Sequence, residues 1–419
     1  MCVLSIHTIC APITLQIYNK NYTFTHILYR IVISLFFFHV IKRMIVHGVS
    51  FLLLPLPHSF FIAFAEMKKR TGKTVKSAKK RKSRKIVIIA VVAVAVAVTA
   101  AAAVIAPYLT SGADATTRVY VYPNATSEAV ADSLAATEGK NFAGRVGTLL
   151  WLLDVNLANR VGAYDIAPGD SPLDVARRIR NKGQAGVKFT FQNVRTKEQF
   201  AERAAAKFLM SKEDVMQCLN DSAFCASLGK TPATIPGVLM ADSYEFYWGV
   251  SAKNMIQKIA GYADSFWTQE RKAKAAALGL STDDVVIIAS IIEEETAKSD
   301  ERGKVARLYI NRLRQGMKLQ ADPTVKFALG DFALRRITHA MLTCESPYNT
   351  YRWEGLPPGP IRFPERSAID AVLNAPEHNF TYMCAKEDFS GYHNFTDNYA
   401  AHLRNAARYQ AELNKRGIR

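Results

Sequence analysis

The longest apolar run in the chain is Ile86–Ala106, which consists of Ile, Val and Ala with one Thr and no charge. As a helix it is long enough to cross about 30 Å of hydrocarbon. The Lys/Arg cluster at 79–85 directly before it predicts a cytoplasmic N-terminus, with everything after Pro107 outside the cytoplasm. A cleaved signal peptide is the alternative, but its apolar region is usually shorter. We therefore expect a retained transmembrane helix over residues 86–108.

The segment before this run divides at Met67. Residues 1–66 are apolar and aromatic, interrupted by Pro55 and Pro57, and have no helical or strand period. Residues 67–85 are basic and are expected to be a cytoplasmic tail. We interpret residues 1–66 as the product of an over-extended start, not part of the native protein. The alternative is one or two additional membrane segments.

Beyond the apolar run, a strand, a polar turn and a helix follow one another three times. In each copy a Ser or Thr stands at the expected helix N-cap. This alternation predicts a small α/β module over 118–210. The module either resembles the LysM-like glycan-binding arrangement or is a scaffold without a ligand. A connector is expected over 211–233. The strands are expected at Val119–Tyr122, Gly162–Ile166 and Val187–Phe191, and the helices at Glu128–Ala136, Pro172–Asn181 and Lys197–Phe208.

A larger α+β domain is expected over residues 234–419, and one of its helices carries an unusual end. The helix starts near Asp283, is nearly all apolar, and finishes in three consecutive carboxylates, 293–295. At about 100° per residue, Glu295 lies on the same face as Val285, Ile288, Ile291 and Ile292. Burial and the negative end of the helix dipole should both raise the pKa of its carboxyl.

Such a carboxyl could work as a general acid near neutral pH. The alternative is that the helix ends by Ile292 and the acidic triplet is solvated, as charge runs usually are. Glu293 points the opposite way around the helix, and Glu294 points to the side.

Further elements follow in this domain. Ser299 is expected to cap a helix that ends at Gly316, and Asp322 is expected to cap another with Pro323 at its first position. A long loop over 346–361 is rich in Pro, Gly and amide side chains, which can supply rigid hydrogen-bonding groups to a binding groove. A polar segment with an aromatic residue, 393–398, lies near the C-terminus.

The net charge of +18 at first suggests a nucleic-acid partner. Residues 1–85 carry +14 of it, which leaves +4 for the rest, so we interpret the basic residues as a topogenic signal and expect no nucleic-acid binding. The sequence contains neither CxxC nor HExxH, and we expect no metal site. An oxidising compartment would permit disulfides; Cys218 could pair with Cys225 and Cys344 with Cys384, although four cysteines allow three pairings.

Six short motifs follow one another in the second half of the chain. They are Ala289-Ser290-Ile291-Ile292-Glu293-x-Glu295-Thr296, Asn311-Arg312-Leu313, Gly316-Met317-x-Leu319-Gln320-x-Asp322-Pro323-Thr324, Tyr348-Asn349-Thr350-Tyr351, Gly355-Leu356-Pro357-Pro358-Gly359-Pro360-Ile361 and His393-x-Phe395 with Asn398. With these motifs in this order, the chain resembles the endolytic murein transglycosylase (YceG-like) family, from Met67 onward. One departure is visible: family members often have Phe-Pro before the Asp of an upstream block, where this chain has Met240-Ala241-Asp242.

The resemblance implies that Glu295, the second acid of the Glu-x-Glu-Thr block, is the catalytic residue. Glu293, Asp322 and Asn349 are candidates to stabilise the positive charge that develops on the sugar. No cofactor is implied. The full set of expected substrate-binding residues is Glu293, Asn311, Gln320, Asp322, Thr324, Tyr348, Asn349, Thr350, His393 and Asn398.

The expected function is that of a membrane-anchored lytic transglycosylase. It would cleave the MurNAc–GlcNAc β-1,4 bond in nascent peptidoglycan strands, leave a 1,6-anhydro end and thereby terminate glycan elongation. Its partners would be glycan strands, the inner membrane and, as the family resemblance suggests, peptidoglycan synthases. A hydrolytic muramidase and a non-enzymatic wall-binding protein are the alternatives. The expected fold is α+β: one transmembrane helix, a small LysM-like module and a larger catalytic domain on the extracytoplasmic side.

Overall fold

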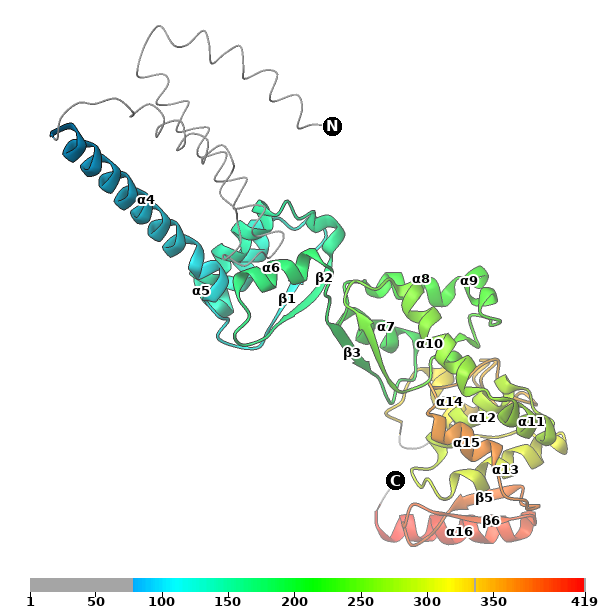
Figure 1. Ribbon diagram of the computed structural model, residues 1–419. Helices are drawn as coiled ribbons and strands as arrows, with labels where there is room; N and C mark the ends of the chain where they lie inside the picture. Colours follow the sequence, from blue (N-terminus) through cyan, green and yellow to red (C-terminus); the bar gives the residue numbers. More distant parts are fainter. Residues whose placement is uncertain (1–77, 335–336, 418–419) are drawn as a thin grey trace. The chain divides into compact units, whose positions relative to one another are not determined.

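The computed structural model describes residues 78–334 and 337–417, and these form two compact units (Figure 1). The first unit ends at Gln184, and the second begins at Ala185. The fold is mixed α+β, mostly helical, with small two-stranded sheets. The doubtful segment 1–66 and most of the basic tail lie outside the described residues.

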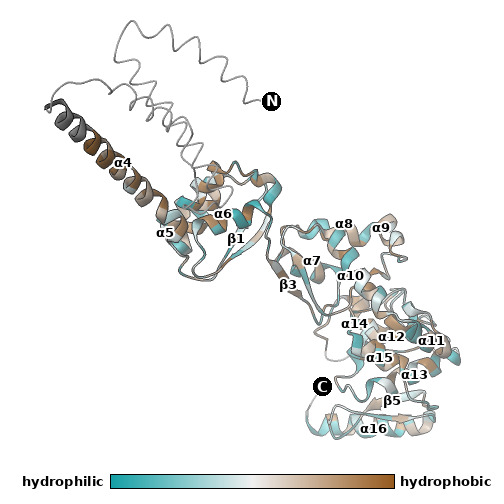
Figure 2. Ribbon diagram, viewed as in Figure 1, coloured by the Kyte–Doolittle hydropathy of each residue, from teal (hydrophilic) through white to brown (hydrophobic). Residues whose placement is uncertain are grey.

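Helix α4, Ala78–Thr110, contains the apolar run. Its part Val87–Thr110 is long and apolar enough to cross a membrane, and Figure 2 shows this stretch in brown. Its valines and isoleucines are largely exposed, which suits a helix that contacts lipid and not a protein core. The prediction of one long apolar helix before the folded units is confirmed. The helix continues through Pro107 to Thr110, slightly beyond the predicted end.

In the first unit, β1 (Thr117–Val121) pairs antiparallel with β2 (Gly162–Ile166). Between them lies α5, Ser127–Leu152, which bends at Gly139, where φ is +77°. That bend makes α5 two helical segments, so the predicted helix was too short. The unit also contains η2 (Leu157–Arg160) and α6 (Pro172–Arg180). The fully buried core side chains include Val121, Leu134, Val146, Tyr164, Ile166 and Ile179.

The third predicted strand does not join this sheet. It forms β3, Gly186–Thr190, which pairs antiparallel with β4, Ser243–Tyr247, and places Phe189 opposite Tyr244. The third strand–helix repeat therefore lies in the second unit, whereas the sequence placed it in the module over 118–210. Sequence period predicts a strand but does not specify its partner. An aromatic cluster of Phe189, Phe191, Phe200 and Phe363 packs behind this sheet.

The expected helix caps of the three repeats are present. The side chains of Thr126, Ser171 and Thr196 each accept a hydrogen bond from a backbone N–H in the first turn of the following helix. These bonds satisfy donors that the helix itself leaves without partners. After the third repeat, the region predicted as a connector contains α8 (Lys212–Asn220) and α9 (Ser222–Ser227), following α7 (Lys197–Ala205) and preceding η3 (Ile235–Val238).

The remainder of the second unit is built around α12, Thr282–Glu295, whose residues from Val285 to Glu293 are all buried. It packs against α13, α14 and α15, and Figure 1 shows these helices close together, with the β5–β6 hairpin and α16 at the C-terminal end. The other elements are α10 (Ala252–Phe266), α11 (Gln269–Leu278), α13 (Arg302–Arg314), α14 (Asp322–Leu329), η4 (Met341–Thr343), α15 (Arg366–Leu373), β5 (Tyr382–Ala385), β6 (His393–Thr396) and α16 (Tyr399–Lys415).

The predicted cap of α13 was wrong. Helix α13 begins at Arg302 with Glu301, not Ser299, in the cap position. The Glu301 carboxylate instead accepts hydrogen bonds from Thr296 and His393, which ties the turn to β6.

The suggested disulfides are also absent, since Cys218, Cys225, Cys344 and Cys384 are all free thiols. Cys225 Sγ points to the backbone carbonyls of Cys218 and Leu219, and Cys344 Sγ accepts a hydrogen bond from Asn349. The thiols of Cys225 and Cys344 therefore have other partners.

Candidate functional site

Helix α12 carries Glu295 to the edge of the core. Ser281 and Asp284 form a reciprocal capping box at its start, and the helix continues to Glu295 before Thr296 turns into extended backbone. Val285, Ile288, Ile291 and Ile292 are fully buried. The predicted face is therefore confirmed, and the alternative of a helix ending at Ile292 with a solvated triplet is wrong.

The Glu295 carboxyl meets a tyrosine of the neighbouring helix. Tyr309 on α13 donates its hydroxyl proton to Glu295 Oε1 at 2.5 Å. The pKa of Glu295 is raised to about 7. Burial is the main cause and the negative charge of Asp322 adds to it, while the Tyr309 hydrogen bond and the charges of Lys326 and Arg312 oppose the rise. A carboxyl with this pKa can both give and take a proton near neutral pH.

A second carboxylate lies close to the first. Asp322 is the first residue of α14, and Tyr351 in the long loop donates to its Oδ1 at 2.6 Å. Asp322 was expected to cap this helix, but Ala321 occupies the cap position and the Asp322 side chain is exposed. The carboxylate is therefore available to a ligand, and the electrostatic influence of Asp322 on Glu295 places it within the same site.

Three of the residues predicted to bind substrate form hydrogen bonds within the loop and α14. The hydroxyls of Thr324 and Thr350 lie 2.8 Å apart, and Thr350 Oγ1 accepts from the Ala321 N–H at 3.0 Å. Asn349 is fully buried; its amide donates to the carbonyls of Leu342 and Cys344 and accepts from the Tyr351 N–H. These hydrogen bonds hold the loop segment that carries Tyr351 against the start of α14.

The turn before α14 is held by Arg312. Its guanidinium donates to the carbonyls of Leu319 and Thr381 and to the side chain of Gln320, at 2.7, 2.6 and 3.2 Å. Gln320 adopts φ of +53°, a left-handed conformation that redirects the chain toward Asp322. Arg312 thus connects α13, the turn before α14 and the residue that precedes β5.

The other end of the long loop is fixed to α12. Ser290, fully buried, accepts from the Ile361 N–H at 3.0 Å. A Cβ at Gly359 would lie 2.0 Å from the Ala233 carbonyl oxygen, so only glycine allows this close approach. The loop therefore has little freedom at either end.

Glu293 and Glu294 lie outside the Glu295 site. The Glu293 side chain is fully enclosed, accepts from the Glu365 N–H at 3.1 Å and faces Arg362; burial raises its pKa to about 7. Glu294 pairs with Arg195 and Arg362, each at 2.9 Å. The predicted binding role of Glu293 therefore has no support from its position.

The remaining predicted residues are spread over the domain. Asn311 donates to the carbonyls of His378 and Phe380 and is buried. His393 Nδ1 lies 2.8 Å from Glu301, and Asn398 caps α16. Tyr348 packs on Phe327 with ring centroids 4.7 Å apart. In the structure these side chains have structural partners.

Sequence reasoning missed Tyr309 as the partner of Glu295 and Tyr351 as the partner of Asp322. Tyr309 was not singled out, and Tyr351 appeared only as part of a motif. The available signal is general: a tyrosine hydroxyl that becomes buried needs a hydrogen-bond acceptor.

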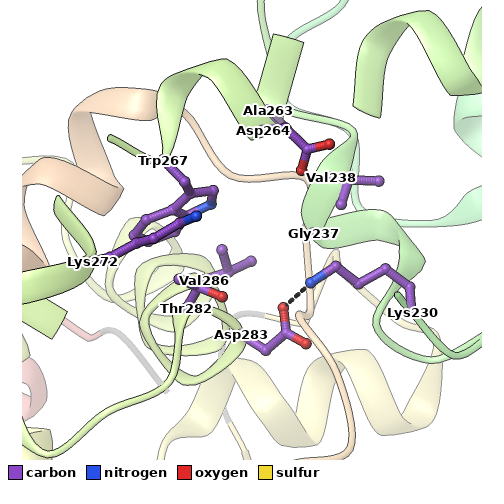
Figure 3. A pocket seen from close by; sticks show the side chains of 10 residues that line it. All are labelled: Lys230, Gly237, Val238, Ala263, Asp264, Trp267, Lys272, Thr282, Asp283 and Val286. Carbon is purple, nitrogen blue, oxygen red and sulfur yellow. Dashed lines mark hydrogen bonds and ion pairs between the residues drawn. The ribbon is translucent and has the colours of Figure 1, made fainter. Parts of the chain in front are cut away.

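Elsewhere in this unit, a cavity of about 210 Å³ lies beside the N-terminal half of α12 (Figure 3). Its charged side chains include Asp264 and Lys272, and Lys230 pairs with Asp283 across it. Among the residues that the structure describes, no group of three His, Cys, Asp or Glu side chains could hold a metal ion.

The YceG-like family matches residues 119–408, most of the chain. The chain belongs to the YceG-like family. It is 29% identical over 280 residues to the endolytic murein transglycosylase of Bacillus subtilis. The aligned region covers 61% of this chain and 75% of that protein. The chain is 27% identical over 182 residues to the Streptococcus pneumoniae R6 protein of the same name, covering 42% of this chain and 32% of that one.

A solved structure is also similar, a putative YceG-like protein from Listeria monocytogenes. It is 25% identical, covers 69% of this chain and 98% of that one, and superimposes with a TM-score of 0.47.

Proposed function

We propose that this protein is a lytic transglycosylase that cleaves the MurNAc–GlcNAc β-1,4 bond of peptidoglycan and leaves a 1,6-anhydro-MurNAc end. The names of its curated relatives supply the substrate class. The observation that carries the chemistry is the Glu295 carboxyl, half-buried beside Tyr309 with its pKa raised to about 7.

One carboxyl can perform both proton transfers. Because Tyr309 occupies Oε1, the acidic proton is carried on Oε2, which is left to face the substrate. Glu295 gives this proton to the glycosidic oxygen as the bond between C1 and that oxygen breaks. The resulting carboxylate then takes the proton of the C6 hydroxyl of the same MurNAc, and O6 bonds to C1. No water is consumed, and Glu295 ends protonated again.

The second carboxylate has a supporting role in this mechanism. The breaking bond leaves positive charge on C1 and the ring oxygen, which a nearby negative charge stabilises. Asp322 is exposed, fixed by Tyr351, and close enough to influence the pKa of Glu295. Its charge also keeps Glu295 protonated before the reaction begins.

We further propose that α4 anchors the protein in the cytoplasmic membrane, with both folded units on the extracytoplasmic side. The orientation rests on the basic residues before the apolar run. The strand, two helical segments and strand of the first unit support a LysM-like glycan-binding role for it. Cleavage within nascent strands beside the membrane would terminate their elongation, in company with peptidoglycan synthases.

The mass of the released fragments tests the reaction type. Uncrosslinked peptidoglycan glycan is incubated with the purified protein in water enriched in ¹⁸O. A transglycosylase releases fragments lighter than hydrolysis products by one water and free of the label. A hydrolytic muramidase would give labelled reducing ends, and that result would contradict the proposal. Binding of glycan without any turnover would favour the non-enzymatic alternative.

A further inference from the structure

A small cavity adjoins the proposed catalytic pair. Its volume is about 100 Å³, and it lies between the end of α12, the first turns of α14 and the segment before α7. Glu294 in its wall directly precedes Glu295, and Pro323 directly follows Asp322. It shares no lining residue with the cavity of Figure 3. Its lining residues are Arg195, Glu294, Pro323, Lys326, Phe332 and Ile361.

One cation of this cavity is already neutralised. Arg195 donates to both oxygens of Glu294, at 2.9 and 3.0 Å, and its guanidinium lies 5.1 Å from the centre of the Phe332 ring. This bidentate pair and the ring contact fix Arg195 in place. It forms a rigid wall.

The second cation is Lys326, which is half-buried. Within the described parts of the chain, its ammonium has no hydrogen bond, ion pair or ring contact. An ammonium group without a negatively charged partner can form a charge-assisted contact with an anion that enters this cavity. Two cations against one carboxylate leave the cavity one positive charge in excess.

The size of the cavity restricts the anion. Water occupies about 30 Å³ per molecule in the liquid, so the cavity has room for about three waters. A carboxylate fits this space, whereas a sugar ring does not. An anion bound here would therefore be a side group of a substrate whose sugars lie along Glu295 and Asp322.

We propose that this cavity binds a carboxylate on the side arm of muramic acid and thereby selects MurNAc over GlcNAc beside the scissile bond. This inference rests on the proposed function. Muramic acid carries a lactyl ether: its carboxyl is free in glycan without peptides and amide-linked to the stem peptide in intact glycan, where the stem supplies carboxylates of its own. GlcNAc offers no such group.

The test varies charge on both partners. Peptide-free and peptide-bearing uncrosslinked glycans are each prepared in two forms, with native carboxylates and with the carboxylates converted to amides. kcat/KM is measured for the full chain in detergent, for Lys326→Gln, and for Lys272→Gln as a control. Lys272 is an exposed lysine lining the other cavity, and its removal changes the net charge equally.

Amidation should lower kcat/KM of the wild type and of Lys272→Gln by about tenfold, the effect of losing one charge-assisted contact. Lys326→Gln should already be low on native glycan and should not respond to amidation. The glycan preparation that shows the effect identifies the lactyl or the stem carboxylate as the ligand. Any influence of Lys326 on the pKa of Glu295 acts on both forms of the glycan and cancels in their ratio.

Two results would overturn the inference while the proposed function stands: a wild type indifferent to amidation, or a Lys326→Gln protein that still responds to it like the wild type. If the wild type cleaves none of the four glycans, the proposed function itself fails and the cavity assignment fails with it.

Discussion

At the scale of single residues, Glu295 was predictable and its partners were not. The spacing of Val285, Ile288 and Ile291 alone places position 295 on the buried face of a helix, and a carboxyl there must have a raised pKa. Tyr309 and Tyr351 come to the two carboxylates only through packing of α13 and of the long loop. A helical period within one segment contains no information about that packing.

The Tyr309 hydroxyl should set the pH range of the enzyme. Its hydrogen bond lowers the pKa of Glu295, so Tyr309→Phe should raise that pKa. Activity that needs the protonated acid is lost as pH rises through this pKa. The alkaline limb of the kcat–pH profile should therefore move to higher pH, by up to about one unit, equivalent to about 1.4 kcal/mol.

Asp322→Asn is the matched control for Tyr309→Phe, because it should shift the pKa of Glu295 in the opposite direction. Removing a negative charge that raises the pKa of Glu295 should lower it, so the alkaline limb should move to lower pH. Equal profiles for both variants, or shifts in the same direction, would contradict the assigned electrostatics.

At the scale of elements, the sequence correctly predicted the caps of the three strand–helix repeats and the helix that ends in Glu295, but not the caps at Ser299 and Asp322 or which polar side chains serve the fold. Thr324, Asn349 and Thr350 belong to motifs of the family, and motif membership alone made them binding candidates. The structure uses all three to hold the loop against α14. Whether a polar side chain faces a ligand or a backbone carbonyl depends on loop geometry, which neither spacing nor composition specifies.

The Glu295 carboxyl at the end of α12 should lower the stability of the folded protein at alkaline pH. The folded-state pKa of Glu295, about 7, exceeds the ordinary value of 4.5, so the folded state binds the proton more tightly than the unfolded state. The contribution of Glu295 to the free energy of unfolding is fully present below about pH 4.5 and is lost as pH rises to about 7. A glutamine at this position does not titrate, so Glu295→Gln should not lose stability over this pH range.

Thermal unfolding of the two proteins in detergent should therefore converge near pH 4.5. At pH 8 the glutamine variant should be more stable, by about 1–3 kcal/mol. A variant less stable than the wild type at pH 8 would show that the carboxylate is better solvated or paired than this structure indicates.

At the scale of the whole molecule, the chain divides into an apolar helix and two units, and the boundary at 184 differs from the expected one. Three similar strand–helix repeats suggested one module, but the third strand pairs with β4, far along the chain. Pairing between distant strands depends on the complementary aromatic faces that meet, here Phe189 and Tyr244, and local patterns do not reveal it.

The orientation of the anchor can be tested with protease. In protoplasts of bacteria producing the protein, external protease should digest both folded units and leave a protected N-terminal fragment ending near the apolar helix. Protection of both units until the membrane is permeabilised would reverse the proposed topology. The net charge before the helix is the physical basis of the expectation.

The central claim concerns one carboxyl, and turnover by paired variants tests it most directly. Glu295→Gln and Glu293→Gln remove the same group two residues apart, and both carboxyls have a pKa raised to about 7. Release of anhydro-muropeptides from uncrosslinked glycan should fall by about 10²–10⁴-fold or more in Glu295→Gln, the usual contribution of a placed acid–base group. Folded Glu293→Gln should retain turnover. Full activity in Glu295→Gln, or equal loss in both folded variants, would contradict the account.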